Sequence, residues 1–185
     1  MKTQRFNAPL EWYEDDVNVN ILGLFELILA LPRNKNQRMI EIGSYMGEST
    51  MLFASSQIFK EIHAIEPFAG HEDFNEKYNH NWYRVKKEFE KNTRFFDNII
   101  HHEAYSYNIV DEFNDDYDFI YIDGSHDYKD IKRDLELYLP KLKKGGIIGG
   151  HDYHEWGWPG VFKAVNEVVG KPDTICCDTS WIKKV

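Results

Sequence analysis

The sequence has few cysteines, no long hydrophobic run and no sign of a secretion signal. Its two cysteines, Cys176 and Cys177, are adjacent. Neighbouring cysteines rarely bridge each other, so a disulfide framework is excluded and a reducing, cytoplasmic setting is favoured. The most apolar stretch, residues 21–31, is short for a membrane span and contains Glu26. Residues 1–16 are polar and acidic, unlike a signal peptide.

The sequence also lacks an excess of positive charge. Its net charge is −9, and nucleic-acid binding depends largely on lysine and arginine. No extended nucleic-acid or membrane surface is therefore expected, and a small-molecule partner is favoured. The 185 residues, 42% of them hydrophobic, suit one globular domain with a sizeable core. Nothing in the sequence indicates the oligomeric state.

Short apolar runs that indicate strands alternate with helical patterns in which apolar residues recur every three or four positions. This alternation predicts a Rossmann-like, doubly wound α/β fold with a mostly parallel sheet and a C-terminal antiparallel hairpin. The predicted strands are residues 39–42, 62–65, 99–102, 117–123, 147–150, 174–177 and 181–185. The predicted helices are residues 17–31 and 48–59, one containing Trp82, Val85 and Phe89, one from Asp127 with Leu142 on its apolar face, which Pro140 ends or bends, and 161–169.

We interpret residues 1–185 as a single domain that begins with a helical segment at residues 1–36. Residues 70–98 are polar and carry many aromatic side chains. Long connections often carry function, so this segment is a candidate lid or substrate wall, above all its first half. Individual roles within it are not indicated.

The first strand ends in a tight glycine turn that opens a helix. Gly43 can adopt backbone angles closed to other residues, which lets a ligand approach the main chain. Gly47 lies where free helix N–H groups point outward. The dinucleotide fingerprint is absent, because Tyr45 and Glu48 stand where it requires glycine. Glu41, inside the strand, disfavours a pyrophosphate and favours a ligand that carries a cation.

Polar residues also follow the other strands, at the edge where open α/β sheets bind ligands. Glu66 closes the second strand and is placed to accept hydrogen bonds from ribose hydroxyls. The clusters at residues 123–126 and 151–152 close the fourth and fifth strands. His101 and His102 alternate to opposite faces of a strand, so one metal ion cannot easily use both.

These clusters resemble, in their order, those of the small bacterial and phage class I S-adenosylmethionine-dependent methyltransferases. The shared features are acid-x-Gly-x-x-x-Gly at residues 41–47, Asp123-Gly-Ser-His-Asp-Tyr, and the later Gly-Gly-Ile-Ile and His-Asp-Tyr. The block from Asp123 to Tyr153 is similar to the macrocin O-methyltransferase group, which acts on sugar hydroxyls. The resemblance covers residues 39–185 and is weakest at 70–98. It implies methyl transfer from S-adenosylmethionine to a small-molecule hydroxyl, with sugars among the implied acceptors.

The resemblance also implies which residues bind the cofactor. The glycine turn would hold its amino acid end, Glu66 its ribose, and Glu103 with Ala104 would border its adenine, while Asp123 would lie beneath the sulfonium. The implied cofactor-binding residues are Glu41, Gly43, Ser44, Tyr45, Gly47, Ser49, Thr50, Glu66, Pro67, Glu103, Ala104, Asp123, Gly124 and Ser125.

The implied catalytic residues are Asp123, His126, His151 and Asp152. In the macrocin group and in catechol O-methyltransferase, acids at the positions of Asp123 and Asp152 hold Mg²⁺. His151 replaces a further acid, and Mg²⁺ prefers oxygen ligands, so a metal site and purely hydrogen-bonding roles both remain open. A histidine suits transfer of the acceptor's proton. His151 is the preferred base, and His126 would contact the cofactor or the substrate.

Two other functions remain open at this point. An NAD-dependent oxidoreductase can share the fold, although the missing third glycine weighs against it. A non-catalytic cofactor-binding module is the second alternative, although the acids and histidines at the strand ends favour an enzyme.

Overall fold

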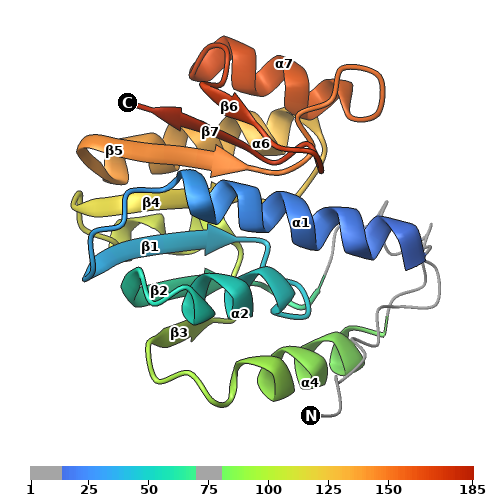
Figure 1. Ribbon diagram of the computed structural model, residues 1–185, viewed down its shortest axis with the longest axis vertical. Helices are drawn as coiled ribbons and strands as arrows, with labels where there is room; N and C mark the ends of the chain where they lie inside the picture. Colours follow the sequence, from blue (N-terminus) through green and yellow to red (C-terminus); the bar gives the residue numbers. More distant parts are fainter. Residues whose placement is uncertain (1–13, 70–80) are drawn as a thin grey trace.

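A seven-stranded sheet forms the centre of the computed structural model, which describes residues 14–69 and 81–185 (Figure 1). Its strand order is β3-β2-β1-β4-β5-β7-β6. The first five strands are parallel, whereas β7 runs antiparallel to β5 and β6 antiparallel to β7. The predicted doubly wound fold with its antiparallel hairpin is confirmed. The strands are Gln37–Ile42 (β1), Phe59–Ile65 (β2), Ile99–His102 (β3), Tyr117–Ile122 (β4), Leu142–Gly150 (β5), Thr174–Ile175 (β6) and Trp181–Lys184 (β7).

Helices cover both faces of the sheet. On one face α1 and α2 lie in front of the strands in Figure 1, with α4 beside α2, and α6 packs with α7 on the other face. Two short helical stretches precede β4 on the chain. The helices are Glu14–Ala30 (α1), Glu48–Ser55 (α2), Trp82–Thr93 (α4), Ser106–Ile109 (α5), Val110–Glu112 (η1), Tyr128–Tyr138 (α6), Leu139–Lys141 (η2) and Pro159–Val168 (α7).

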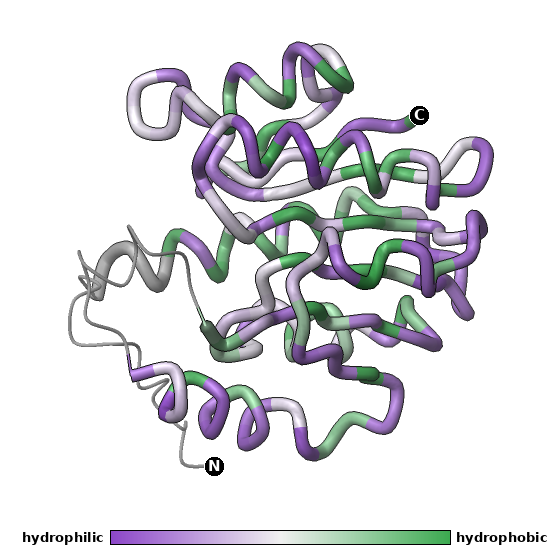
Figure 2. The backbone as a smooth tube through the Cα atoms, turned by 180° about the vertical axis from the view of Figure 1, so that it is seen from behind, coloured by the Kyte–Doolittle hydropathy of each residue, from purple (hydrophilic) through white to green (hydrophobic). Residues whose placement is uncertain are grey.

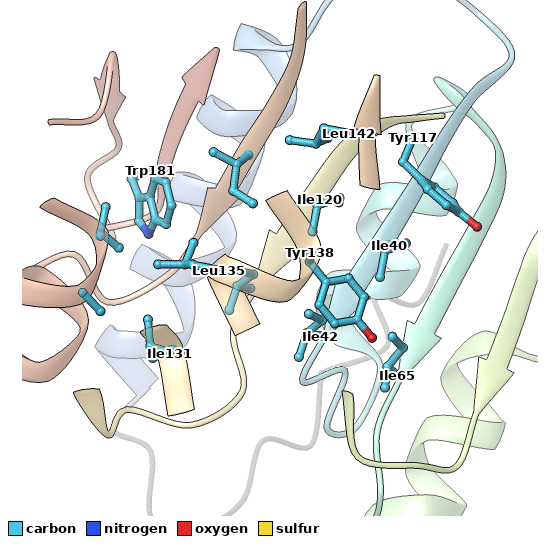
Figure 3. Close-up of a cluster of buried hydrophobic side chains, with 14 of the residues drawn as sticks. Ile40, Ile42, Ile65, Tyr117, Ile120, Ile131, Leu135, Tyr138, Leu142 and Trp181 are labelled. Carbon is cyan, nitrogen blue, oxygen red and sulfur yellow. The ribbon is translucent and has the colours of Figure 1, made fainter. Parts of the chain in front are cut away.

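Alternation along β1 sends its side chains into two different cores. Ile40 and Ile42 face α6 and pack with Leu135 and Tyr138 (Figure 3). Met39 faces the opposite layer, where α1 and α2 cover it. Each fully buried side chain of this kind stabilises the fold by about 1.5–3 kcal/mol. β1 is therefore held from both faces, which fixes the position of the turn that follows it.

The hydropathy of the chain follows this layering. Figure 2 shows hydrophobic residues along the central strands, and the buried hydrophobic side chains lie between the sheet and its helices, although α1 also exposes Leu22, Phe25 and Leu29. Within residues 14–69 and 81–185, we find no helix with the length and apolar content that crossing a bilayer requires.

Several predicted boundaries differ by a few residues from those in the structure, and two helix predictions extend too far. The helix predicted to reach residue 59 ends at Ser55, because Gln57 adopts a left-handed φ of 58° and Phe59 already belongs to β2. The sequence places Leu142 on a helix face, but the helix ends before Pro140 and Leu142 opens β5 beside Tyr117. In both cases an apolar residue that fits the helical period, Phe59 or Leu142, belongs instead to the strand that follows the helix.

Candidate active site

The carboxyl ends of β3, β2, β1, β4 and β5 lie level with one another. The residue that follows each of four strands donates its N–H to the last carbonyl of a neighbouring strand, which extends the sheet by one more bond. These bonds run from Glu66 to His102, Gly43 to Ile65, Asp123 to Ile42 and His151 to Ile122, over 2.8–3.2 Å. The strand-end clusters that the sequence singles out therefore share one edge of the sheet.

The two glycines of the β1–α2 turn are required by the protein's own packing. Gly43 has a φ of +86°, and a Cβ there would lie 2.1 Å from the carbonyl oxygen of Asp123. Gly47 has a φ of +78°, and its Cβ would lie 2.9 Å from the ring of Phe89 in α4. The sequence attributes Gly43 to the approach of a ligand, whereas the structure shows that β4 makes a close approach of its own.

Replacing Gly43 by alanine is expected to destabilise the fold by about 3 kcal/mol, because left-handed strain and a backbone clash add together. Gly170 is a matched control with a φ of +79° and nothing within 4 Å of its Cβ position. Gly170→Ala should cost only the strain, about 1–2 kcal/mol. Urea unfolding of both variants measures the difference, and equal losses would contradict the close approach.

Glu41 is fully buried between β1 and α2. Its carboxylate accepts hydrogen bonds from the hydroxyl of Ser49, at 2.5 Å, and from that of Thr50. Burial raises the pKa of Glu41 to about 7, although these hydroxyl donors favour the charged form. The predicted residues Glu41, Ser49 and Thr50 thus form one hydrogen-bonded unit at the start of α2, with Ser49 half-buried, and their contact with a cofactor stays a prediction.

Glu66 ties the ends of β1 and β2 together. Its Oε2 accepts the N–H of Tyr45 at 2.9 Å, and its Oε1 accepts the N–H of Phe68 at 3.1 Å. Glu103, by contrast, is exposed and forms an ion pair with Lys86 at 2.5 Å. The predicted ribose and adenine residues therefore lie at adjacent strand ends, but only Glu66 is built into the turn.

The remaining predicted cofactor residues shape the turns at this edge. Ser44 is buried, and Pro67 follows Glu66 directly. The hydroxyl of Ser125 donates to Asp130 and accepts the N–H of Asp127, which organises the turn from β4 into α6. Ala104 donates its N–H to the carbonyl of His102, and Gly124 lies on the surface beside Ser125.

His101 and His102 point to opposite faces, as predicted. A ring nitrogen of His102 lies 2.8 Å from one of His63, and the two rings stack. His101 instead packs against Phe68 and Phe89 on the other face. The pair therefore does not form one metal site.

Asp123, His126 and Asp152 come together from the ends of β4 and β5. One donor atom from each lies within 4.8 Å of the others, an arrangement that could hold a metal ion. Nε2 of His126 is 2.7 Å from Oδ2 of Asp152, and its ring stacks on Trp158 with centroids 4.0 Å apart. Asp152 has a left-handed φ of 62°. Such strain at a strand end is common in functional sites.

His151 lies between two acids. Its Nδ1 is 3.1 Å from Oδ1 of Asp152, and its Nε2 is 3.4 Å from Oδ2 of Asp178. Burial lowers the pKa of His151, but the pairing with both acids outweighs it and raises the pKa to about 11. His151 is therefore protonated at neutral pH, which disfavours its predicted role as a base.

The pKa values of the neighbouring groups move in different directions. Burial, aided by the charge of Asp152 and opposed by that of His151, raises the pKa of Asp123 to about 7. Burial lowers the pKa of His126, yet its hydrogen bond to Asp152 gives a net increase. Burial would raise the pKa of Asp152, but the two histidines hold it well below its usual range. Asp152 is therefore the fixed negative charge of the site.

Sequence reasoning missed Asp178 and Trp158 as parts of this site. Asp178 lies in the β6–β7 turn and follows no parallel strand in the sequence, so only the folded hairpin reveals it. Trp158 directly precedes α7, close in sequence to Asp152. An aromatic residue so near a strand-end cluster was a usable signal.

The strand order and the glycine turn define a Rossmann-like α/β fold of the class I methyltransferase type. The chain belongs to the methyltransferase domain family, whose profile matches residues 40–153. This confirms the resemblance to class I S-adenosylmethionine-dependent methyltransferases. A protein of Acanthamoeba polyphaga mimivirus is 32% identical over an alignment of 138 positions that covers 70% of this chain and 58% of that protein. The chain thus spans little more than half of that relative.

Solved methyltransferase structures share the fold at low sequence identity. Aeropyrum pernix fibrillarin with bound S-adenosyl-L-methionine has a TM-score of 0.62 at 14% identity, covering 90% of this chain and 74% of that one. A candidate caffeoyl-CoA O-methyltransferase from Staphylococcus aureus has a TM-score of 0.61 at 19% identity, and the match covers 96% of this chain and 92% of that one. A TDP-rhamnose 3′-O-methyltransferase of calicheamicin biosynthesis has a TM-score of 0.54 at 16% identity, and the match covers 92% of this chain and 78% of that one.

Proposed function

We propose that this protein transfers a methyl group from S-adenosylmethionine to a hydroxyl oxygen of a small molecule, with sugars among the candidate acceptors. The observation that carries the proposal is the meeting of Asp123, His126 and Asp152 beside the glycine turn of β1. Family membership favours methyl transfer over the NAD-dependent alternative. The two free thiols, Cys176 and Cys177, suit the cytoplasmic location that we also propose.

The cofactor would lie along the ends of β1, β2 and β4. Glu66 is nearly buried and fixed by two backbone donors, which keeps its carboxylate at the end of β2. In Rossmann-like folds an acid at this position accepts ribose hydroxyls. We assign the cationic amino group of the cofactor to the region of Glu41 and the adenine to that of Glu103 and Ala104.

Replacing Glu66 by glutamine should weaken S-adenosylmethionine binding by about 1.5–3 kcal/mol, the scale of a hydrogen bond to a charged group. Glutamine keeps an oxygen for one of the two backbone donors. Calorimetry with S-adenosylhomocysteine and with an analogue lacking both ribose hydroxyls separates the causes. An equal loss for the analogue would contradict the ribose role, because Glu66 would then act only on the turn.

The acid and histidine donors fit a divalent cation. Two carboxylates and one imidazole match Mn²⁺ and neighbouring first-row ions better than Mg²⁺, which prefers oxygen. We propose Asp123, His126 and Asp152 as the ligands, with His126 in addition to the two acids predicted from the sequence. A bound ion would supply positive charge where the acceptor oxygen becomes negative.

The side chains of the site divide the remaining tasks. His151, protonated beside Asp152, offsets the negative charge of the acids and orients that carboxylate. Asp123 has a pKa of about 7, so in the absence of an ion it is better suited than His151 to take up the acceptor's proton near neutral pH. Trp158 covers one face of His126 and restricts its ring.

Two measurements test the proposed function. S-adenosylmethionine should protect the protein against heat and NAD should not, because only a ligand that binds the native state raises its stability. A labelled methyl donor should then transfer its methyl group to at least one acceptor in a panel of sugars, nucleotide sugars, catechols and other phenols. Protection without transfer to any of them would favour a non-catalytic binding module, and protection by NAD alone would overturn the proposal.

A further inference from the structure

A carboxylate from the far edge of the sheet lies behind the candidate active site. The side chain of Asp178, in the β6–β7 turn, is fully buried, and its Oδ2 lies 3.4 Å from Nε2 of His151. The other nitrogen of that ring lies 3.1 Å from Oδ1 of Asp152, whose Oδ2 pairs with His126 at 2.7 Å. Asp178, His151, Asp152 and His126 thus form a continuous acid–histidine row.

Helix α1 makes room for this carboxylate. A Cβ on Gly23 would lie 1.8 Å from Cγ of Asp178, so the carboxyl group occupies the space of a side chain. Glycine in a helix interior costs about 1 kcal/mol relative to alanine. The chain nevertheless has glycine where α1 covers Asp178. Asp178 is therefore enclosed between α1 on one side and His151 on the other.

The turn itself does not account for a charged residue at this position. Oδ1 of Asp178 accepts the N–H of Ser180 at 2.9 Å, and Oδ2 accepts its hydroxyl at 2.8 Å. Asparagine could make the first of these bonds equally well, since asparagine and aspartate form the same turn. Burying a carboxylate is costly unless an opposite charge pairs with it. The structure places the imidazole of His151 beside it, with Nε2 3.4 Å from Oδ2 of Asp178.

We propose that Asp178 is a positioning residue for the active site. It fixes the ring of His151, which in turn holds Asp152 with its second oxygen directed at His126. Gly23 provides the necessary space, so α1 belongs to the support of the site. The functional meaning of this inference rests on the methyltransferase activity proposed above, but the arrangement itself can be measured without a methyl acceptor.

Asp178→Asn is the direct test, because asparagine keeps the bond to the backbone N–H of Ser180 and removes the charge. Asp173→Asn is the matched control, since Asp173 is an exposed acid of the same hairpin that pairs with Lys183. Long-range ¹H–¹⁵N spectra of histidine-labelled protein, assigned through histidine-to-glutamine variants, report on each ring. We expect His151 and His126 resonances to shift in Asp178→Asn and to stay unchanged in Asp173→Asn.

The shift of His126 is decisive, because in the described part of the chain the polar contacts that lead from Asp178 to His126 pass through His151 and Asp152. A folded Asp178→Asn protein with unchanged His126 resonances would overturn the proposal. Gly23→Ala disturbs the same contact from α1, and it tests the positioning role of Asp178 if Asp178→Asn does not fold. Alanine normally stabilises a helix interior over glycine by about 1 kcal/mol. Here we expect a lower Tm and the same His126 shift, and a higher Tm with unchanged resonances would refute the inference.

Kinetics separate this inference from the proposed function. With an acceptor that the wild type methylates, Asp178→Asn should lower kcat by about 10- to 100-fold, the scale of losing a group that holds a site residue in place. The KM for S-adenosylmethionine should not change. A wild type that transfers no methyl group would refute the proposed function but not the histidine shifts. Normal kcat in Asp178→Asn despite those shifts would refute the positioning role alone.

Discussion

Asp152→Asn should lower kcat at least about 100-fold and leave the affinity for S-adenosylmethionine nearly unchanged, because only interactions of the transition state are lost. Asp152 is the shared partner of His126 and His151 and one of the three proposed metal ligands. Asparagine tolerates its left-handed φ of 62°, so the variant removes charge without adding backbone strain. Alanine at this position would remove the charge and also add backbone strain.

Asp127→Asn is the matched control, since Asp127 is an exposed acid of the neighbouring β4–α6 turn. Transfer of a labelled methyl group, measured with and without a chelator, completes the experiment. If the site holds an ion, the chelator should mimic Asp152→Asn in the wild type, and added Mn²⁺ should restore the wild type only. Full activity of Asp152→Asn would place the chemistry elsewhere. If Asp152→Asn is inactive but the chelator does not affect the wild type, Asp152 acts in catalysis and the proposed metal site is wrong.

The amino-acid sequence is sufficient to predict the sheet and the groups at its carboxyl edge. Period-two and period-3.6 patterns locate the parallel strands and most helices, and strand ends in such a sheet necessarily share an edge. The positions of Glu66, Asp123 and Asp152 directly after predicted strands therefore suffice to assign them to one edge. The structure confirms this shared edge, whereas their binding and catalytic roles remain proposals.

Other features depend on contacts that no local pattern contains. The packing of Gly43 on β4 and of Gly23 on Asp178 involves residues 80 or more positions apart. The raised pKa of His151 has the same origin in part, because Asp178 of the last hairpin adds to the effect of the adjacent Asp152. A histidine at a strand end is equally compatible with a base and with a fixed cation, and only its neighbours decide. Residues 70–80, the core of the predicted lid, lie outside the described part of the chain.

Glu41 offers a test in which stability and binding should change in opposite directions. Its folded pKa of about 7 lies above its ordinary value of 4.5. Folding therefore favours the protonated form, so the stability that Glu41 contributes is complete below pH 4.5 and is lost as the pH rises through 7. At pH 8 the buried charge costs about 3 kcal/mol, at 1.36 kcal/mol for each pKa unit. Glutamine has nearly the same shape and carries no charge.

Glu41→Gln should therefore raise the free energy of unfolding at pH 8 by up to about 3 kcal/mol, with the gain disappearing near pH 4.5. If Glu41 also attracts the amino group of S-adenosylmethionine, the same variant should bind the cofactor about 10- to 100-fold more weakly, the scale of a hydrogen bond to a charged group. Urea unfolding across this pH range and calorimetry at pH 8 measure the two effects.

Glu103→Gln, an exposed control, should change stability by less than about 0.5 kcal/mol. A stabilised variant with unchanged cofactor affinity would make Glu41 a structural partner of Ser49 and Thr50. An unstabilised variant would contradict the buried charge itself.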